Sequence, residues 1–171
     1  PPVPTAAVDQ REEKTEDTGT GELDGARMVR VKGSDGPVTE LDMGEYLWGV
    51  VAAEMPASFE PEALKAQAVA ARTYTLWKTL HNTGAHPDAD LCTDYACCQA
   101  WISREDAAAN WGENAQTYTD KIAAAVADTD GLAALFRGQP IQAVFFSSAA
   151  GRTVDAVEGW GNAVPYLTSV D

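Results

Sequence analysis

Two helical segments joined by a short turn constrain the fold of this chain more than any other feature. Residues 44–55 carry apolar side chains at helical spacing, and Pro56 disfavours helical geometry at the residue before it, so the first helix ends there. Pro61 suits the first position of a second helix, which is dense in alanine and continues to residue 77. Because the turn is only residues 56–60, the two helices are expected to lie antiparallel.

Shorter elements are predicted on both sides of this helix pair. Strands are expected at 28–31, 132–136 and 141–146, helices at 105–111 and 120–127, and a loop at 81–98. The last two strands would form a hairpin around the turn 137–140. Since helices and strands do not alternate as βαβ units, we predict an α+β fold. Its helical N-terminal part, carrying Glu54 and Arg72, packs on an antiparallel β part.

The N-terminal segment differs in composition from the rest. Residues 1–25 contain several prolines, many acids and few apolar side chains, so they cannot bury enough surface to offset ordering entropy. We predict a disordered linker over 1–25 and a domain over 26–171. The linker is either a tether to a removed membrane anchor or a plain solvated tail. Because the chain starts at Pro1 and shows no signal peptide, we expect a targeting segment to have been removed.

The charge balance excludes several function classes. The chain has 12 Lys and Arg against 26 Asp and Glu, a formal net charge of −14. Nucleic-acid binding requires clustered basic residues that neutralise phosphates, so it is disfavoured, as is a polybasic membrane-surface segment. No apolar run approaches the roughly 18 residues of a membrane-spanning helix.

One carboxylate occupies an unexpected position. Glu54 follows Leu47, Val50 and Val51 at helical spacing, which places it on the apolar face of the first helix. An apolar setting and the negative end of the helix dipole both disfavour a charged carboxylate, and a carboxyl that stays protonated can act as a general acid. Periodicity alone favours the alternative, a Glu at a frayed helix end that reaches solvent.

The second helix supplies candidate partners for this carboxyl. Arg72 lies on the helix that follows Glu54, so an antiparallel pair could bring the two side chains together; the alternative is a surface Arg. Gln67 and Tyr74 are candidates for polar lining of the same cleft, although spacing favours an exposed Gln67.

Long stretches of the chain resemble the SpoIID/LytB family. The first block, residues 46–59 and 62–74, is nearly gapless, and residues 138–148, 151–153 and 160–171 match as well. The resemblance covers roughly residues 41–171.

This resemblance implies a lytic transglycosylase that cleaves between N-acetylmuramic acid and N-acetylglucosamine in peptidoglycan glycan strands, leaving a 1,6-anhydro product. The family's catalytic Glu, in its Ala-Glu-Met-Pro motif, falls on Glu54, and its catalytic-site Arg falls on Arg72.

Hydrolytic glycosidases use two carboxylates. A transglycosylase can instead use the sugar's C6 hydroxyl as nucleophile, so one Glu serves as acid and then base. We expect Arg72 to bind substrate or to lie at an intermediate distance from Glu54. A tight ion pair between the two side chains would lower the pKa of Glu54 and oppose its role as a general acid. The implied location is extracytoplasmic.

The sequence departs from the family pattern in three places, one of which is a longer region from Ser103 to Tyr118. Ser147 and Ser148, which we expect to contact substrate, are followed by Ala149-Ala150 where the family usually has two glycines. Family members also often continue beyond Asp171, so we expect part of the domain to lie outside this sequence. A rival interpretation is therefore a non-catalytic peptidoglycan-binding module that enhances a cell-wall amidase, as the LytB side of the family is described.

The cysteines are crowded into one loop. His86, Cys92, Cys97 and Cys98 could provide four tetrahedral zinc ligands. The alternative is a Cys92–Cys98 disulfide with Cys97 free. Some members of the family that this chain resembles bind zinc in this loop with two His and two Cys. His86, Cys92 and Cys98 match three of these ligands by spacing, and Cys97 occupies the position of the second His. Gln99, just after the cluster, is expected to line the glycan groove.

Overall fold

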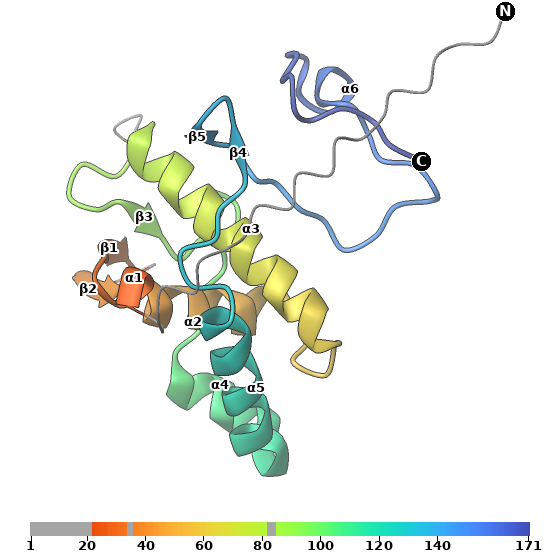
Figure 1. Cartoon of the computed structure of the whole chain (residues 1–171). Coiled ribbons are helices and arrows are strands. Elements are labelled where there is room, and N and C mark those ends of the chain that lie inside the picture. Colours follow the sequence, from red (N-terminus) through yellow and green to blue (C-terminus); the bar gives the residue numbers. More distant parts are fainter. Residues whose placement is uncertain (1–21, 34–35, 82–84) are drawn as a thin grey trace, which may run out of the picture.

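The computed structural model describes residues 22–33, 36–81 and 85–171 (Figure 1). Residues 1–21, which make up most of the predicted linker, lie outside the described residues. The described part of that segment differs from the prediction, because residues 22–25 form α1 (Glu22–Gly25) and Asp24 within it is buried. The folded domain therefore begins before residue 26.

A group of helices forms the core. α2 (Met43–Glu54) lies against α3 (Pro61–Leu80) and α5 (Ala115–Ala127), and α4 (Arg104–Trp111) packs on α5 after the short 3-10 turn Gly112–Asn114 (Figure 1). α2 is the central element, since most of its side chains are buried. Its N-terminus is capped by Asp42, whose side chain accepts a hydrogen bond from the Glu45 amide at 2.9 Å. Both helices predicted around Pro56 and Pro61 are thus present.

A small mixed sheet covers one end of these helices. β1 (Met28–Lys32) pairs antiparallel with β2 (Val38–Asp42) and parallel with β3 (Leu91–Cys92), in the order β2-β1-β3. β3 lies within the segment predicted as a loop, and the Arg30 guanidinium pairs with the Asp90 carboxylate beside it at 2.9 Å. The pairing anchors the cysteine-bearing segment on β1.

The predicted C-terminal hairpin is much shorter than expected. Only β4 (Leu135–Phe136) and β5 (Gln139–Pro140) pair, across a turn in which Arg137 and Gly138 have φ of 52° and 77°. Two successive positive φ angles are those of a type I′ hairpin turn. The strand predicted at 141–146 is wrong: its residues form no strand, because the pairing ends at Pro140, and Val144, Phe145 and Phe146 stay exposed.

The chain then continues through α6 (Ala156–Trp160), apart from the helical core in Figure 1. Helices and two small sheets together confirm the predicted α+β class. Among the described residues, no helix combines the length and the apolar character needed to cross a lipid bilayer.

Close packing at Gly49 fixes the position of the chain that runs beside α2. A β-carbon at residue 49 would overlap the Trp101 indole, and the Ile102 amide donates to the Gly49 carbonyl at 3.3 Å. Residues 100–102 can therefore lie directly against the helix only because residue 49 has no side chain.

Gly49→Ala is expected to destabilise the protein. Helix propensity alone would stabilise by about 1 kcal/mol, but overpacking a buried site costs roughly 1–3 kcal/mol, and the overlap with the rigid Trp101 ring places Gly49 at the upper end of this range. The net loss of about 1–2 kcal/mol lowers Tm by several degrees. Thermal unfolding followed by circular dichroism measures it, with exposed Ala53 replaced by Gly as a control for propensity. An unchanged or raised Tm for Gly49→Ala would contradict the close approach.

Candidate active site

A pocket of about 480 Å³ lies at the C-terminal end of α2. This volume is within the range of ligand-binding sites in proteins. Its wall combines Glu54 of α2, Tyr74 of α3, the loop 95–99, the segment 142–145 and Trp160 of α6. Residues distant in sequence therefore converge on Glu54.

Glu54 is held in this pocket by a backbone hydrogen bond. It is the last residue of α2, and its Oε1 accepts from the Ala100 amide at 2.8 Å. The side chain is half-buried and does not extend freely from a frayed helix end. Among the described residues that line the pocket, Glu54 is the only acid and no Lys or Arg is present. The arrangement is one oriented carboxyl group without a cationic partner in the wall.

Tyr74 places a second polar group in the same pocket. Burial, followed by the nearby Cys98, Cys97 and Cys92 sulfurs, raises the pKa of Tyr74 to about 12. Its hydroxyl therefore stays protonated at neutral pH and is able to donate a hydrogen bond. The prediction that Tyr74 lines the cleft of Glu54 agrees with this geometry.

The predicted metal ligands converge beside the pocket. The ligand atoms of His86, Cys92, Cys97 and Cys98 all lie within 4.8 Å of one another. His86 Nε2 lies 3.2 Å from Cys97 Sγ and 3.5 Å from Cys98 Sγ, and the two sulfurs are 4.0 Å apart. Zn–S bonds of about 2.3 Å would separate tetrahedral ligands by roughly 3.8 Å. The four residues fit a metal ion, and all three cysteines are free thiols.

Two of the thiols, those of Cys97 and Cys98, have a raised pKa. Burial raises the pKa of Cys98 to about 12, and burial also raises the pKa of Cys97. A bound metal ion reverses this preference for the protonated form, because ligating thiols are deprotonated.

The candidate metal ligands and the pocket share one loop. The Asp94 carbonyl accepts from the Cys97 and Cys98 amides, and its carboxylate accepts from the Ala96 amide, forming a tight turn. Two residues after Cys98, the Ala100 amide bonds to Glu54. The loop that holds the ligands thus also holds the carboxyl group.

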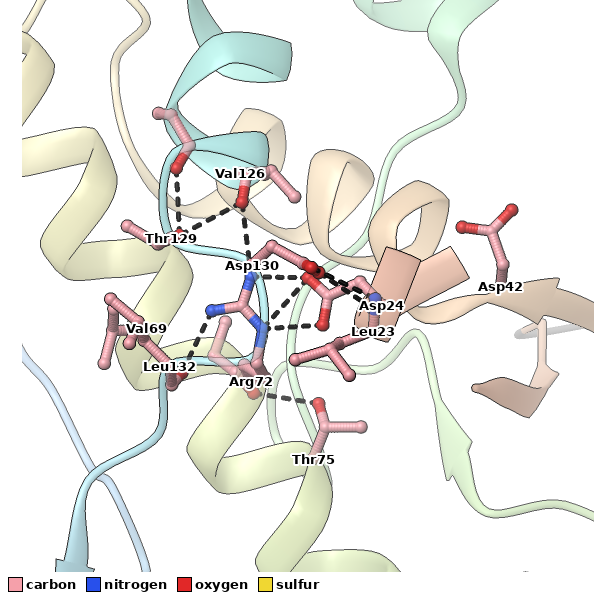
Figure 2. A network of polar contacts seen from close by, with 12 residues as sticks. Leu23, Asp24, Asp42, Val69, Arg72, Thr75, Val126, Thr129, Asp130 and Leu132 are labelled. Atoms are coloured by element: carbon pink, nitrogen blue, oxygen red, sulfur yellow. Dashed lines mark hydrogen bonds and ion pairs between the residues drawn. The ribbon is translucent and has the colours of Figure 1, made fainter. Parts of the chain in front are cut away.

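Arg72 does not reach this pocket. The residue is 1 % exposed and its guanidinium contacts Asp24 of α1, with Nη2 2.6 Å and Nε 2.9 Å from the carboxylate oxygens (Figure 2). The remaining donors bond to the Leu132 and Val126 carbonyls at 3.1 Å and 3.4 Å. Asp130 accepts from the Leu23 and Asp24 amides and completes the network (Figure 2).

This placement differs from the predicted cleft shared by Glu54 and Arg72. Arg72 and Tyr74 are two positions apart on α3, which turns their side chains about 200° from each other. Tyr74 faces the pocket, so Arg72 faces α1 and α5 instead. The expected contact of Arg72 with substrate has no support in this geometry, because the residue is buried and each of its three side-chain nitrogens already bonds within the fold.

Of the remaining predicted substrate-binding residues, one lines the pocket and three do not. Gln67 is buried, in contrast to the exposure expected from spacing, and does not line the pocket. Gln99 lines the pocket but is 2 % exposed, and its Nε2 bonds to the Thr75 and Tyr46 hydroxyls. Ser147 and Ser148 are exposed and follow the pocket-lining segment without belonging to it.

A second, smaller hollow of about 200 Å³ lies near α1. Its acids already have structural partners: Asp42 caps α2, Asp24 pairs with Arg72, and Asp130 accepts from the α1 amides. We therefore regard the pocket of Glu54 as the candidate active site.

Sequence reasoning missed several residues that contribute to the pocket of Glu54 or to the ion pair of Arg72. The Ala100 backbone amide has no side-chain signal in a sequence. Asp24 lies among many acids of a segment predicted to be disordered, and Tyr95 and Trp160 reach the pocket from a loop and a five-residue helix. The signal that could have indicated Tyr95 is its position between Cys92 and Cys97.

The chain is similar in sequence to known proteins over most of its length. The model of the family described as SpoIID, Stage II sporulation protein, matches residues 32–136. Stage II sporulation protein D of Bacillus subtilis is 42 % identical over 134 residues, which are 78 % of this chain and 39 % of the relative. The protein of that name from Bacillus amyloliquefaciens is 40 % identical over 138 residues, 80 % of this chain and 40 % of the relative.

An amidase enhancer of Bacillus subtilis is 38 % identical over 121 residues, 71 % of this chain and 14 % of the relative. The chain thus spans about two fifths of the sporulation relatives and a smaller part of the enhancer.

The fold and the pocket define an α+β domain with one oriented carboxyl group beside four clustered residues able to bind a metal ion. The chain belongs to the SpoIID family, as the resemblance of its sequence predicted.

Removing either partner of the buried ion pair is expected to destabilise the fold. Arg72→Met or Asp24→Ala leaves one buried charge unpaired, at a cost of about 3–5 kcal/mol. Thermal and urea unfolding measure this, and the double variant should recover part of the loss, because it leaves no unpaired charge. An Arg72→Met protein of unchanged Tm would contradict a structural role for the residue.

Proposed function

We propose that this protein is a lytic transglycosylase that cleaves the MurNAc–GlcNAc bond of peptidoglycan glycan strands. The observation that carries the proposal is the single oriented carboxyl group in the pocket wall. Membership of the SpoIID family supports a role at the cell wall, and the resemblance of the Ala-Glu-Met-Pro motif assigns the chemistry to Glu54.

Glu54 acts first as an acid in this mechanism. Its carboxyl proton passes to the glycosidic oxygen as the bond to C1 of MurNAc breaks, and the oxygen leaves as a hydroxyl of GlcNAc. Positive charge develops at C1, as in other glycosidic cleavages. The Glu54 carboxylate then takes the proton of the MurNAc C6 hydroxyl, whose oxygen bonds to C1 and closes the 1,6-anhydro ring.

One carboxylate is sufficient for this route. A hydrolase needs a second carboxylate as base or nucleophile, at about 5–9.5 Å from the first. The nucleophile here belongs to the substrate, so the Glu54 carboxylate can serve in both half-steps. The Ala100 amide orients Oε1, and the protonated Tyr74 hydroxyl is available for a substrate oxygen.

The metal cluster fits a structural role for zinc. Three thiols and one imidazole are a ligand set that zinc prefers. When bound, zinc supplies a cross-link within the loop 86–98. His86 and the three cysteines would then hold the loop in the position from which the Ala100 amide reaches Glu54.

The proposal places the protein outside the cytoplasm, where its polymer substrate is found. A membrane anchor outside the described residues would fit a tethered enzyme, and a cell-wall amidase that strips stem peptides is a suitable partner.

A second candidate function is a non-catalytic module that enhances an amidase. It is favoured by the 38 % identity to an amidase enhancer and by the Ala149-Ala150 departure from the family pattern. The two functions predict different products. An enhancer alone releases no anhydro sugars but increases the release of stem peptides by an added amidase.

Glu54→Gln is expected to lower the release of 1,6-anhydro products by at least about 100-fold, since the amide cannot donate the required proton. Purified glycan strands are digested and analysed by mass spectrometry, with Tm measured to confirm folding. Glu105→Gln, a substitution of an exposed carboxylate outside the pocket, is the matched control. Full activity of Glu54→Gln would refute the proposed chemistry.

Metal analysis is expected to find one zinc per chain, held by the cluster. Chelation, or Cys92→Ser, should remove the metal and lower Tm by roughly 5 °C or more, because a ligand that binds only the folded state stabilises it. Glu54→Gln should keep its zinc. A metal-free protein whose mass is lower by two hydrogen atoms would instead indicate a disulfide and contradict the zinc site.

A further inference from the structure

We propose that Tyr95 and Trp160 are the sugar-binding walls of the pocket, stacking on N-acetylhexosamine rings beside Glu54. This inference rests on the proposed function and goes beyond it, because it assigns glycan recognition to two side chains from separate elements. Tyr95 stands on the metal-binding loop between Cys92 and Cys97, and Trp160 ends α6.

Both rings are unusually exposed for large apolar groups. Tyr95 is 80 % and Trp160 59 % exposed, although both line a defined pocket. Neither stacks on another aromatic ring among residues 22–33, 36–81 and 85–171. Exposed aromatic rings grouped around a concave surface mark a binding site better than scattered apolar residues do.

The chemistry of a pyranose matches these rings. One face of the sugar presents several C–H bonds, whose hydrogens are attracted to the negative face of an aromatic ring. The sugar edges carry hydroxyl and amide groups, which the polar atoms of Glu54, Tyr74 and Gln142 can meet in the same pocket. The wall contains no Lys or Arg among the described residues, so it fits an uncharged ring better than an anionic group.

Tyr95 also connects sugar binding to the metal-binding loop. It precedes Ala96, whose amide bonds to Asp94, and Cys97, whose Sγ lies 3.2 Å from His86 Nε2. The position of its ring thus depends on the turn that presents two of the four ligands. Trp160 comes from α6, which carries none of them. Loss of the cluster geometry should therefore weaken the Tyr95 contribution and leave the Trp160 contribution.

The test measures binding without turnover, in the Glu54→Gln background. Isothermal titration with chitotetraose and with peptide-free glycan strands should show a Kd roughly tenfold weaker for Tyr95→Ala and for Trp160→Ala. Tyr95→Phe keeps the ring and should bind normally. Phe146→Ala is the matched control, because Phe146 is 62 % exposed and follows the pocket-lining segment but does not line the pocket.

Tryptophan fluorescence provides an independent readout. Stacking should alter the emission of Trp160, so the spectral change on chitotetraose binding should disappear in Trp160→Phe while binding persists. The Cys92→Ser protein should resemble Tyr95→Ala in affinity and keep the Trp160 signal.

Affinities of Tyr95→Ala and Trp160→Ala equal to that of the parent, or a parent that binds neither glycan, would overturn the inference. If both variants kept their glycan affinity and lost only the binding of an added amidase, the rings would contact the amidase instead of the sugar, and the inference would also be overturned. Failure of the proposed chemistry is distinguishable, because it would appear as retained activity in Glu54→Gln, whereas failure of the stacking walls appears in affinity alone.

Discussion

The buried ion pair between Arg72 and Asp24 is the interaction on which the arrangement of the helices depends. One guanidinium joins α1, α3 and the carbonyls at and beyond the end of α5. The end of α5 is the negative end of its helix dipole, where a cation is stabilising. Since α3 is held in this rotation, Tyr74 on its opposite side faces the pocket. A polar contact within the core therefore determines which residues of α3 are available to substrate.

The pocket itself is assembled from segments with little regular structure. Apart from Glu54 at a helix end and Tyr74 within α3, its wall consists of a loop, an irregular stretch and the last residue of a short helix. Such segments have few backbone hydrogen bonds to hold them, so they need local anchors. The turn at Asp94 and the packing of Trp101 on Gly49 supply two of them. A third is the Tyr166 hydroxyl, which accepts a hydrogen bond from the Gln142 amide at 3.0 Å.

Sequence reasoning succeeded where the signal is local. Pro56 follows the end of one helix, Pro61 begins the next, and the four clustered ligands lie within one short loop. Spacing singled out Glu54 but favoured a side chain that reaches solvent from a frayed helix end, because the Ala100 amide that holds it has no sequence signal. Sequence reasoning failed where the determinant is distant. The partner of Arg72 lies 48 positions away, in a segment whose composition resembles a solvated tail. The apolar run at 141–146 was typical of a strand, but none of the described strands pairs with it.

The spacing between Cys98 and Ala100 has a consequence for how this protein can change through evolution. Only two peptide units separate a cluster ligand from the amide that holds Glu54, a reach of about 7 Å. An insertion or deletion between them would uncouple the two features in a single step. A chain that lacks the ligands therefore needs another anchor to keep the Ala100 amide in place beside Glu54.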